Sequence, residues 1–278
     1  MTKPLTSIDS HIGNVGFLND AGVAFGVKEV GNKPRVSAMP YTYDIAEGNI
    51  PGHQAFRVIG YNGDVGSTQE DLWEAGGLYV FPTGGIQMEV IGNAADAAAG
   101  TGVQQVEIHY LDTSYEPQSE IVTMNGATAV PTVATNIFRV QQFHSVRVGS
   151  GGAAAGAISL RATADTPIYS QIGIGGNVAL TGVWTVPKNK TAFITAWQVG
   201  AAGGNKDARF LLRMTSSIYG EISPGIMKAH DVIVVEDGSV SIQFTMPIRV
   251  PSTADIKLSV VSAAQTAKCA GNFAGWYE

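Results

Sequence analysis

The chain contains little charge, a single cysteine and few aromatic residues. Lys, Arg, Asp and Glu make up 14% of the 278 residues, and Phe, Trp and Tyr make up 8%. The lone Cys269 excludes an internal disulfide and any zinc site built from several cysteines. Because it lies among small residues near the end of the chain, we expect Cys269 to be buried as a small hydrophobic side chain.

Long apolar runs and basic stripes are also missing. No stretch approaches the roughly 20 apolar residues of a membrane span, and the first twenty residues lack the apolar run of a signal peptide. The formal net charge is -6, with the acidic excess before residue 164. Phosphate neutralisation needs clustered Lys and Arg. We therefore expect a protein made and folded in the cytoplasm, with no membrane and no nucleic acid as partner.

The motifs of common enzyme classes are absent. The sequence has no nucleophile elbow, no HExxH and no P-loop. Gly92, Gly100 and Gly102 suggest a phosphate cradle, but no Lys-Ser/Thr follows, so a flexible connection between strands is the better interpretation. Paired carboxylates for polysaccharide cleavage stay open, because only their three-dimensional separation defines them. We expect a protein without catalytic residues, metal ligands or cofactors.

What the sequence does contain is β-structure, best illustrated by residues 103–126. Val106, Ile108 and Tyr110 alternate with polar residues, and a second extended run, 120–124, ends at Asn125-Gly126. This pattern predicts an antiparallel strand pair with one buried and one wet face. The wet or inter-subunit face comprises Gln105, Glu107 and His109.

The second half of the chain has the cleaner strand patterns. In residues 240–248 the side chains predicted to point inward are Val240, Ile242, Phe244, Met246 and Ile248. The apolar run 232–235 indicates a strand covered on both sides. No stretch has a convincing helical period, so the sequence predicts an all-β protein. We expect an irregular N-terminal arm (1–40), a β-sandwich domain (41–163) and a jelly-roll-like β-sandwich domain (164–278).

Two polar features need an interpretation. Glu70, Asp71 and Glu74 surround Trp73 and suggest calcium, but EF-hand spacing is absent, which favours a solvated loop.

The second feature is His144 in the run 138–148. Strict alternation places Gln142 and His144 on the buried face, whereas a β-bulge at Gln141-Gln142 shifts the register. In either case a polar group needs a partner. The five histidines show no pair at ligand spacing, so we expect a hydrogen-bonded core or interface histidine in preference to a metal ligand.

Several segments resemble virion structural proteins of tailed bacteriophages. They are AFRVIGYNGDVGSTQEDLWEAGG, VEIHYLDTSYEPQSEIVTMNGATAVPTVATNIFRVQQF, DTPIYSQI and WTVPKNKTAFITAW, within residues 41–200. The resemblance implies a virion protein present in many copies, either a capsid decoration (cement) protein that stabilises the head shell or a tail fibre or baseplate component. It also implies a homotrimer of β-sandwiches that binds the major capsid protein or other virion proteins.

A carbohydrate-binding module is the alternative, because jelly rolls often hold sugars. Trp184, Trp197 and Tyr219 are the candidate stacking surfaces. Trp197 shares its inward parity with Phe193, which favours a core position for Trp197.

Overall fold

The structure is a computed structural model that describes residues 41–203, 207–263 and 266–278, together with four short strands within 1–40. The chain divides into two compact units, residues 1–51 and residues 52–278. Each unit is described by itself.

The first unit contains two short strand pairs and one helix. Strand β1 (Gly16–Leu18) pairs antiparallel with β2 (Ala24–Gly26), and β3 (Lys28–Glu29) pairs with β4 (Pro34–Arg35). Helix α1 covers Tyr41–Ala46. The remainder of the predicted arm, 1–40, lies outside the described residues.

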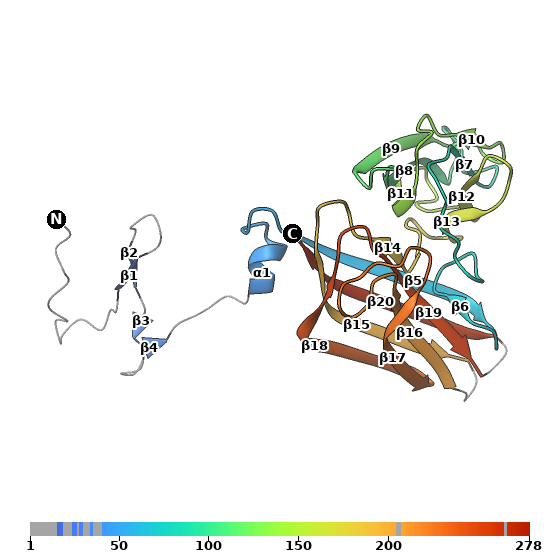
Figure 1. Cartoon of the computed structure of the whole chain (residues 1–278). Coiled ribbons are helices and arrows are strands. Elements are labelled where there is room, and N and C mark those ends of the chain that lie inside the picture. The colour runs from blue at the N-terminus through green and yellow to red at the C-terminus, as the bar shows by residue number, and fades with distance from the viewer. Residues whose placement is uncertain are drawn as a thin grey trace. The chain divides into compact units, whose positions relative to one another are not determined.

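The second unit contains a jelly roll (Figure 1). Its strands, from first to eighth, are β5 (Gln54–Val65), β14 (Val183–Thr185), β15 (Ala192–Ala202), β16 (Asp207–Met214), β17 (Lys228–Glu236), β18 (Gly238–Val250), β19 (Asp255–Ser262) and β20 (Ala267–Tyr277). The first strand pairs with the eighth, the second with the seventh, the third with the sixth and the fourth with the fifth, as nested Greek keys require. The resulting sheets have the orders β5-β20-β15-β18 and β14-β19-β16-β17, and β6 (Glu70–Asp71) adds to β19.

A second sandwich is inserted between the first two strands of the jelly roll. One sheet has the order β10-β7-β12-β13 and the other β11-β8-β9. The bounds are β7 (Met88–Ile91), β8 (Val103–Leu111), β9 (Pro117–Thr123), β10 (Val130–Pro131), β11 (Arg139–Val148), β12 (Ile158–Ala162) and β13 (Ile168–Ile172). The antiparallel pair β8–β9 confirms the predicted hairpin. The predicted all-β class with sandwich architecture is confirmed as well.

The strand pairing crosses the domain boundaries that the sequence suggested. The boundary near residue 163 separates β12 from β13, although these strands pair with each other. Strand β5 lies in the predicted first domain but pairs with β20 at the end of the chain. Hydrophobic alternation identifies a strand without identifying its partner, and this pair spans about 200 residues of sequence.

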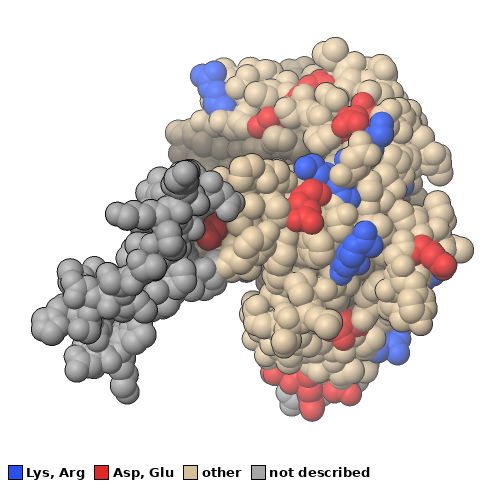
Figure 2. Space-filling model, turned by 60° about the vertical axis from the view of Figure 1, so that its left-hand side comes forward, with Lys and Arg blue, Asp and Glu red and all other residues tan. Residues whose placement is uncertain are grey.

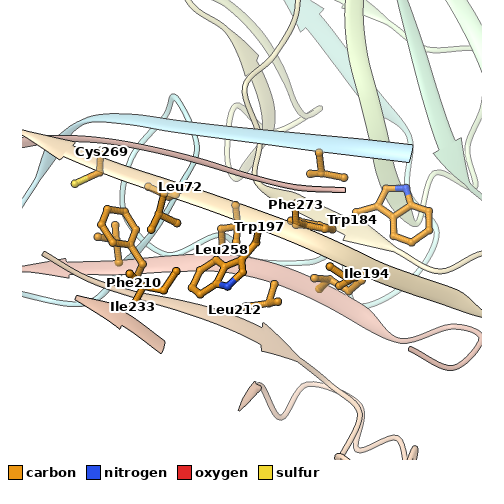
Figure 3. Close-up of a cluster of buried hydrophobic side chains, with 14 of the residues drawn as sticks. Leu72, Trp184, Ile194, Trp197, Phe210, Leu212, Ile233, Leu258, Cys269 and Phe273 are labelled. Carbon is orange, nitrogen blue, oxygen red and sulfur yellow. The ribbon is translucent and has the colours of Figure 1, made fainter. Parts of the chain in front are cut away.

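The jelly-roll core is formed by the inward rows of its two sheets (Figure 3). Trp197, Phe210 and Phe273 are among the largest fully buried side chains. Cys269 is buried in the same core, as expected, and burial raises the pKa of its thiol to about 11. Trp197 also takes the predicted core position.

Two predictions about the second half are wrong in part. Met246 and Val240 were expected to point inward, but their side chains are 83% and 37% exposed. Strand β18 is an edge strand, and in its ladder with β15 four residues (244–247) lie opposite the single Thr195. This bulge moves Met246 out of the alternating register.

Strand β17 was expected to be covered on both sides. Ile233 and Val235 are buried at 7% and 5% exposure, but Val232 and Val234 are 48% and 57% exposed. One face of this apolar strand is therefore open in the protomer.

No helix within the described parts of the chain is long and apolar enough to cross a membrane.

Candidate functional site

The acidic residues around Trp73 are structural anchors, so the predicted solvated loop is wrong. Asp71 is fully buried and accepts hydrogen bonds from Ser259 Oγ (2.6 Å) and from the Tyr79 backbone N–H (2.8 Å). Its Oδ2 also lies 3.0 Å from Lys257 Nζ. A buried carboxylate needs such partners, and these contacts hold β6 against the jelly roll.

The other two carboxylates of this cluster bind backbone amides. Glu70 accepts hydrogen bonds, each 2.9 Å long, from Gly66 N–H, Gly77 N–H and the Asn62 side chain. Burial acts to raise the pKa of Glu70, but these three hydrogen bonds together hold the pKa below its usual value. Burial likewise raises the pKa of Glu74, and there it outweighs the hydrogen bonds from two backbone amides.

The glycine-rich connection after β7 is organised by a residue that sequence reasoning missed. Asp96 is fully buried and accepts backbone hydrogen bonds from Asn93, Val103, Ala155 and Gly156, at 2.8 to 3.2 Å. The interpretation of this loop as a flexible connection is therefore wrong. The N–H groups of Gly92, Gly100 and Gly102 donate to backbone carbonyls of this region and so do not point into a phosphate cradle.

A buried polar network joins the inserted sandwich to the jelly roll. Arg139 on β11 donates to Asp255 on β19 through Nε (2.8 Å) and Nη2 (3.2 Å). The hydroxyl of Thr185 also donates to Asp255 (2.7 Å). The side chain of Gln141 forms two hydrogen bonds with the Thr185 backbone, so both junction residues of β11 contact the same region.

Next to this junction, the β8–β11 ladder carries a cluster of two histidines and a glutamate. The ladder shifts register at Gln141, which confirms the bulge alternative over strict alternation. The bulge places Phe143 in the core and His144 on the opposite face. His144 then lies directly across from Glu107, and His109 is two residues along β8 on the same face.

The three side chains of this cluster lie close together. His109 Nε2 is 3.5 Å from Glu107 Oε1, and His144 Nε2 is 3.6 Å from Glu107 Oε2. The imidazole rings are stacked, with centroids 5.5 Å apart and planes 6° apart. Among the described residues these three form the group of potential ligand atoms within 4.8 Å of one another. The predicted hydrogen-bonded His144 is not observed, since its Nδ1 is buried without a partner.

A cavity lies beside the cluster, between β5 and the β8–β11 ladder. Its volume is about 580 Å³, and His109, Gln142, Arg57 and Trp184 contribute to its wall. His109 therefore borders both the cluster and the cavity. The sequence contained one signal for the cluster, the i, i+2 spacing of Glu107 and His109. The position of His144 opposite Glu107 depends on the strand register, which only the structure provides.

The candidate sugar-stacking residues do not form one surface. Trp184 and Trp197 are 7% and 1% exposed, and Trp184 stacks on Phe56 with ring centroids 4.5 Å apart. Tyr219 is 86% exposed. The two tryptophans belong to the core, which removes the main motive for a carbohydrate site.

Comparisons with known proteins add little to this geometry. No protein-family model and no curated protein matches the chain. Two solved structures with weak similarity come from infectious bursal disease virus. One is the structure of the Gt strain, with 9% identity and a TM-score of 0.17, and the other is the VP2 subviral particle, with 11% identity and a TM-score of 0.16. Each alignment covers 86% of this chain and 77% of the other, and at these scores neither a shared fold nor a shared function follows.

Proposed function

We propose that this chain is a non-enzymatic structural component of a virus particle, and specifically a decoration (cement) protein that binds and stabilises the head shell of a tailed phage. The observation that carries the proposal is the open apolar face and unprotected edge of β17 in the jelly roll. Such a surface is typical of a protein that is covered by neighbouring subunits.

The open face extends over three strands. Val232 lies opposite Leu211 in the β16–β17 ladder. Val234 lies opposite the exposed Arg209, which in turn lies opposite Val261 on β19. We name Leu211, Val232, Val234 and Val261 the outer apolar strip. Val232 and Val234 are about half exposed, and Leu211 and Val261 are partly buried. A second protein that covered this strip would remove apolar surface from water.

The two edge strands on this side of the jelly roll differ in protection. Strand β18 carries Pro247 and a four-residue bulge, both of which block addition of another strand. Strand β17 contains no proline, and its register shift against β16, at His230, lies before the sequence VIVV (232–235) in its second half. Among the described strands it pairs with β16 alone. An unprotected β-branched edge favours pairing with another chain.

Fold and surface composition are compatible with this function. Jelly rolls are frequent in viral capsid and lectin domains, although fold alone does not establish function. Figure 2 shows a face on which uncharged residues occupy most of the surface. Together with the phage-like segments in residues 41–200, these features support a protein that packs closely in a particle as a homotrimer, with the major capsid protein or other virion proteins as partner.

The direct test is quantitative mass spectrometry of purified particles of the phage whose genome encodes the chain, which gives the copy number per particle. We expect the protein to be present in hundreds of copies, as a decorated head requires. A dozen copies or fewer would favour a tail fibre or baseplate component, and absence from the particle would refute both forms of the proposal.

The role of β17 has a separate test. Val234→Lys places a charge on an exposed position and should convert a trimer into a monomer in size-exclusion chromatography with light scattering. Ser241→Lys makes the same charge change on the protected edge strand β18 and should leave the trimer intact. A wild-type chain that stays monomeric at high concentration, or equal behaviour of both variants, would contradict assembly through β17.

A further inference from the structure

We propose that Glu107, His109 and His144 form a binding site for a divalent transition-metal ion of the zinc type. The inference rests on the geometry of the β8–β11 ladder and is independent of the particle assignment.

The backbone places all three side chains on one surface. Glu107 and His144 are directly opposed residues of an antiparallel pair, and His109 follows Glu107 by two residues on the same face. Directly opposed Cβ atoms lie about 5 Å apart, which is close enough for two side chains to reach one ion. Between two register shifts of β11, residues 142–145 pair continuously with residues 106–109 of β8, so this part of the ladder holds the three side chains on one face.

The distances fit shared coordination better than hydrogen bonding. The two Nε2–carboxylate separations are 3.5 and 3.6 Å, which exceeds the usual limit of about 3.2 Å for a hydrogen bond. Ligands on one tetrahedral zinc ion, with bonds of about 2.0 to 2.1 Å, are separated by about 3.3 Å. Each imidazole Nε2 therefore has nearly the spacing from a Glu107 oxygen that a common ion imposes, and one ligand atom from each of the three residues lies within 4.8 Å of the others.

The surroundings of His144 favour the neutral ring that a metal requires. Burial of His144, assisted by the nearby His109, holds the pKa of His144 below its usual value, although Glu107 acts in the opposite direction. Neutral imidazole is the form that binds a metal. Two stacked imidazolium rings would repel each other, whereas one cation between the ring nitrogens and Glu107 satisfies all three groups.

The chemistry of the donors selects the ion. Two imidazole nitrogens and one carboxylate suit Zn²⁺ and its neighbours in the first transition row, while Mg²⁺ and Ca²⁺ prefer sites made entirely of oxygen. The side chains of Glu107, His109 and His144 are 21%, 42% and 26% exposed. The fourth coordination position can therefore be taken by water. A bound ion would cross-link β8 to β11.

The test is calorimetric titration of the full chain, free of any histidine tag, with Zn²⁺. We expect one ion per chain, no heat with Mg²⁺, and with Co²⁺ the visible absorption bands of a low-symmetry site. His144→Ala and His109→Gln should each weaken zinc binding by about 100-fold or more. Replacement of a residue that only hydrogen-bonds to a metal ligand costs about 10–100-fold in affinity, and loss of a ligand itself should cost at least as much. His53→Gln removes a histidine outside the cluster and should leave the affinity unchanged.

Thermal unfolding keeps the test informative if His144→Ala folds poorly. His109 is the most exposed of the three side chains, so His109→Gln should retain the fold. Zinc should raise the melting temperature of the wild type and of His53→Gln, because an ion that binds only the folded state stabilises it. It should not raise that of His109→Gln. Absence of zinc binding at micromolar concentration, or equal affinity in wild type and His109→Gln, would overturn the proposal.

Discussion

Replacement of Arg139 by methionine should strongly destabilise the junction between the inserted sandwich and the jelly roll. The Arg139 and Asp255 side chains are 9% and 6% exposed, and two hydrogen bonds join them. The guanidinium group also lies over the Phe138 ring, 3.9 Å from its centroid. Arg139→Met leaves the Asp255 carboxylate buried with the Thr185 hydroxyl as its remaining side-chain donor.

The expected magnitude follows from this burial. Removal of one partner of a buried ion pair costs about 3–5 kcal/mol, because the other charge stays desolvated. An exposed pair contributes about 0–1 kcal/mol. Lys188 and Glu116 provide the matched control, since their side chains are 45% and 48% exposed and the Nζ–Oε1 distance is 3.5 Å. Lys188→Met should therefore change stability little.

The assay is equilibrium unfolding in urea, followed by tryptophan fluorescence and by circular dichroism. Arg139→Met should lower the free energy of unfolding by about 3 kcal/mol or more, and the double variant Arg139→Met/Asp255→Leu should recover part of this loss because no unpaired charge remains. If Arg139→Met costs no more than Lys188→Met, the junction does not depend on this ion pair and the reasoning is refuted.

Three further predictions concern a carboxylate, a thiol and a glycine. Glu70→Gln should destabilise the protein at pH 7. Because folding lowers the pKa of Glu70, the ionised carboxylate stabilises the fold above its unfolded-state pKa of about 4.5, and this stabilisation is lost as the pH falls and the group is protonated. The difference in stability between variant and wild type should therefore shrink below about pH 4.5, as measured by urea unfolding at several pH values. Since the pKa of Cys269 is about 11, its thiol should react with a disulfide reagent at pH 8 only after unfolding. Gly275→Ala should lower the melting temperature, at a cost of about 1–3 kcal/mol, because the new Cβ would overlap the Phe193 carbonyl, whereas Gly84→Ala, with open space around it, should have little effect.

The sequence was sufficient for the class of fold and for the strands with strict alternation. Val106, Ile108 and Tyr110 alternate with polar residues, and their burial follows that pattern. Alternation reports which face of a strand is buried, because side chains project to opposite sides of the sheet. It fails at Met246 of β18, which lies within the four-residue bulge and is exposed although Phe244 and Ile248 on either side are partly buried.

The pairing of distant strands could not be predicted in the same way. Strand β5 reads as an ordinary strand of the first half, yet it forms the first strand of the jelly roll with β20 as its partner. The burial of two carboxylates could not be predicted from the sequence either. Asp71 and Asp96 look like loop residues in sequence, since their donors come from backbone amides and side chains that only the folded chain brings together.

A single inserted residue connects the junction and the candidate metal site. Without the bulge at Gln141, alternation would place His144 toward the core and Phe143 toward solvent. With it, Phe143 is fully buried and His144 faces Glu107. The extra residue itself hydrogen-bonds the Thr185 backbone at the second jelly-roll strand. The contact that docks the inserted sandwich and the register that assembles the Glu107–His109–His144 cluster therefore have the same origin, so a change that removed the bulge should abolish both together.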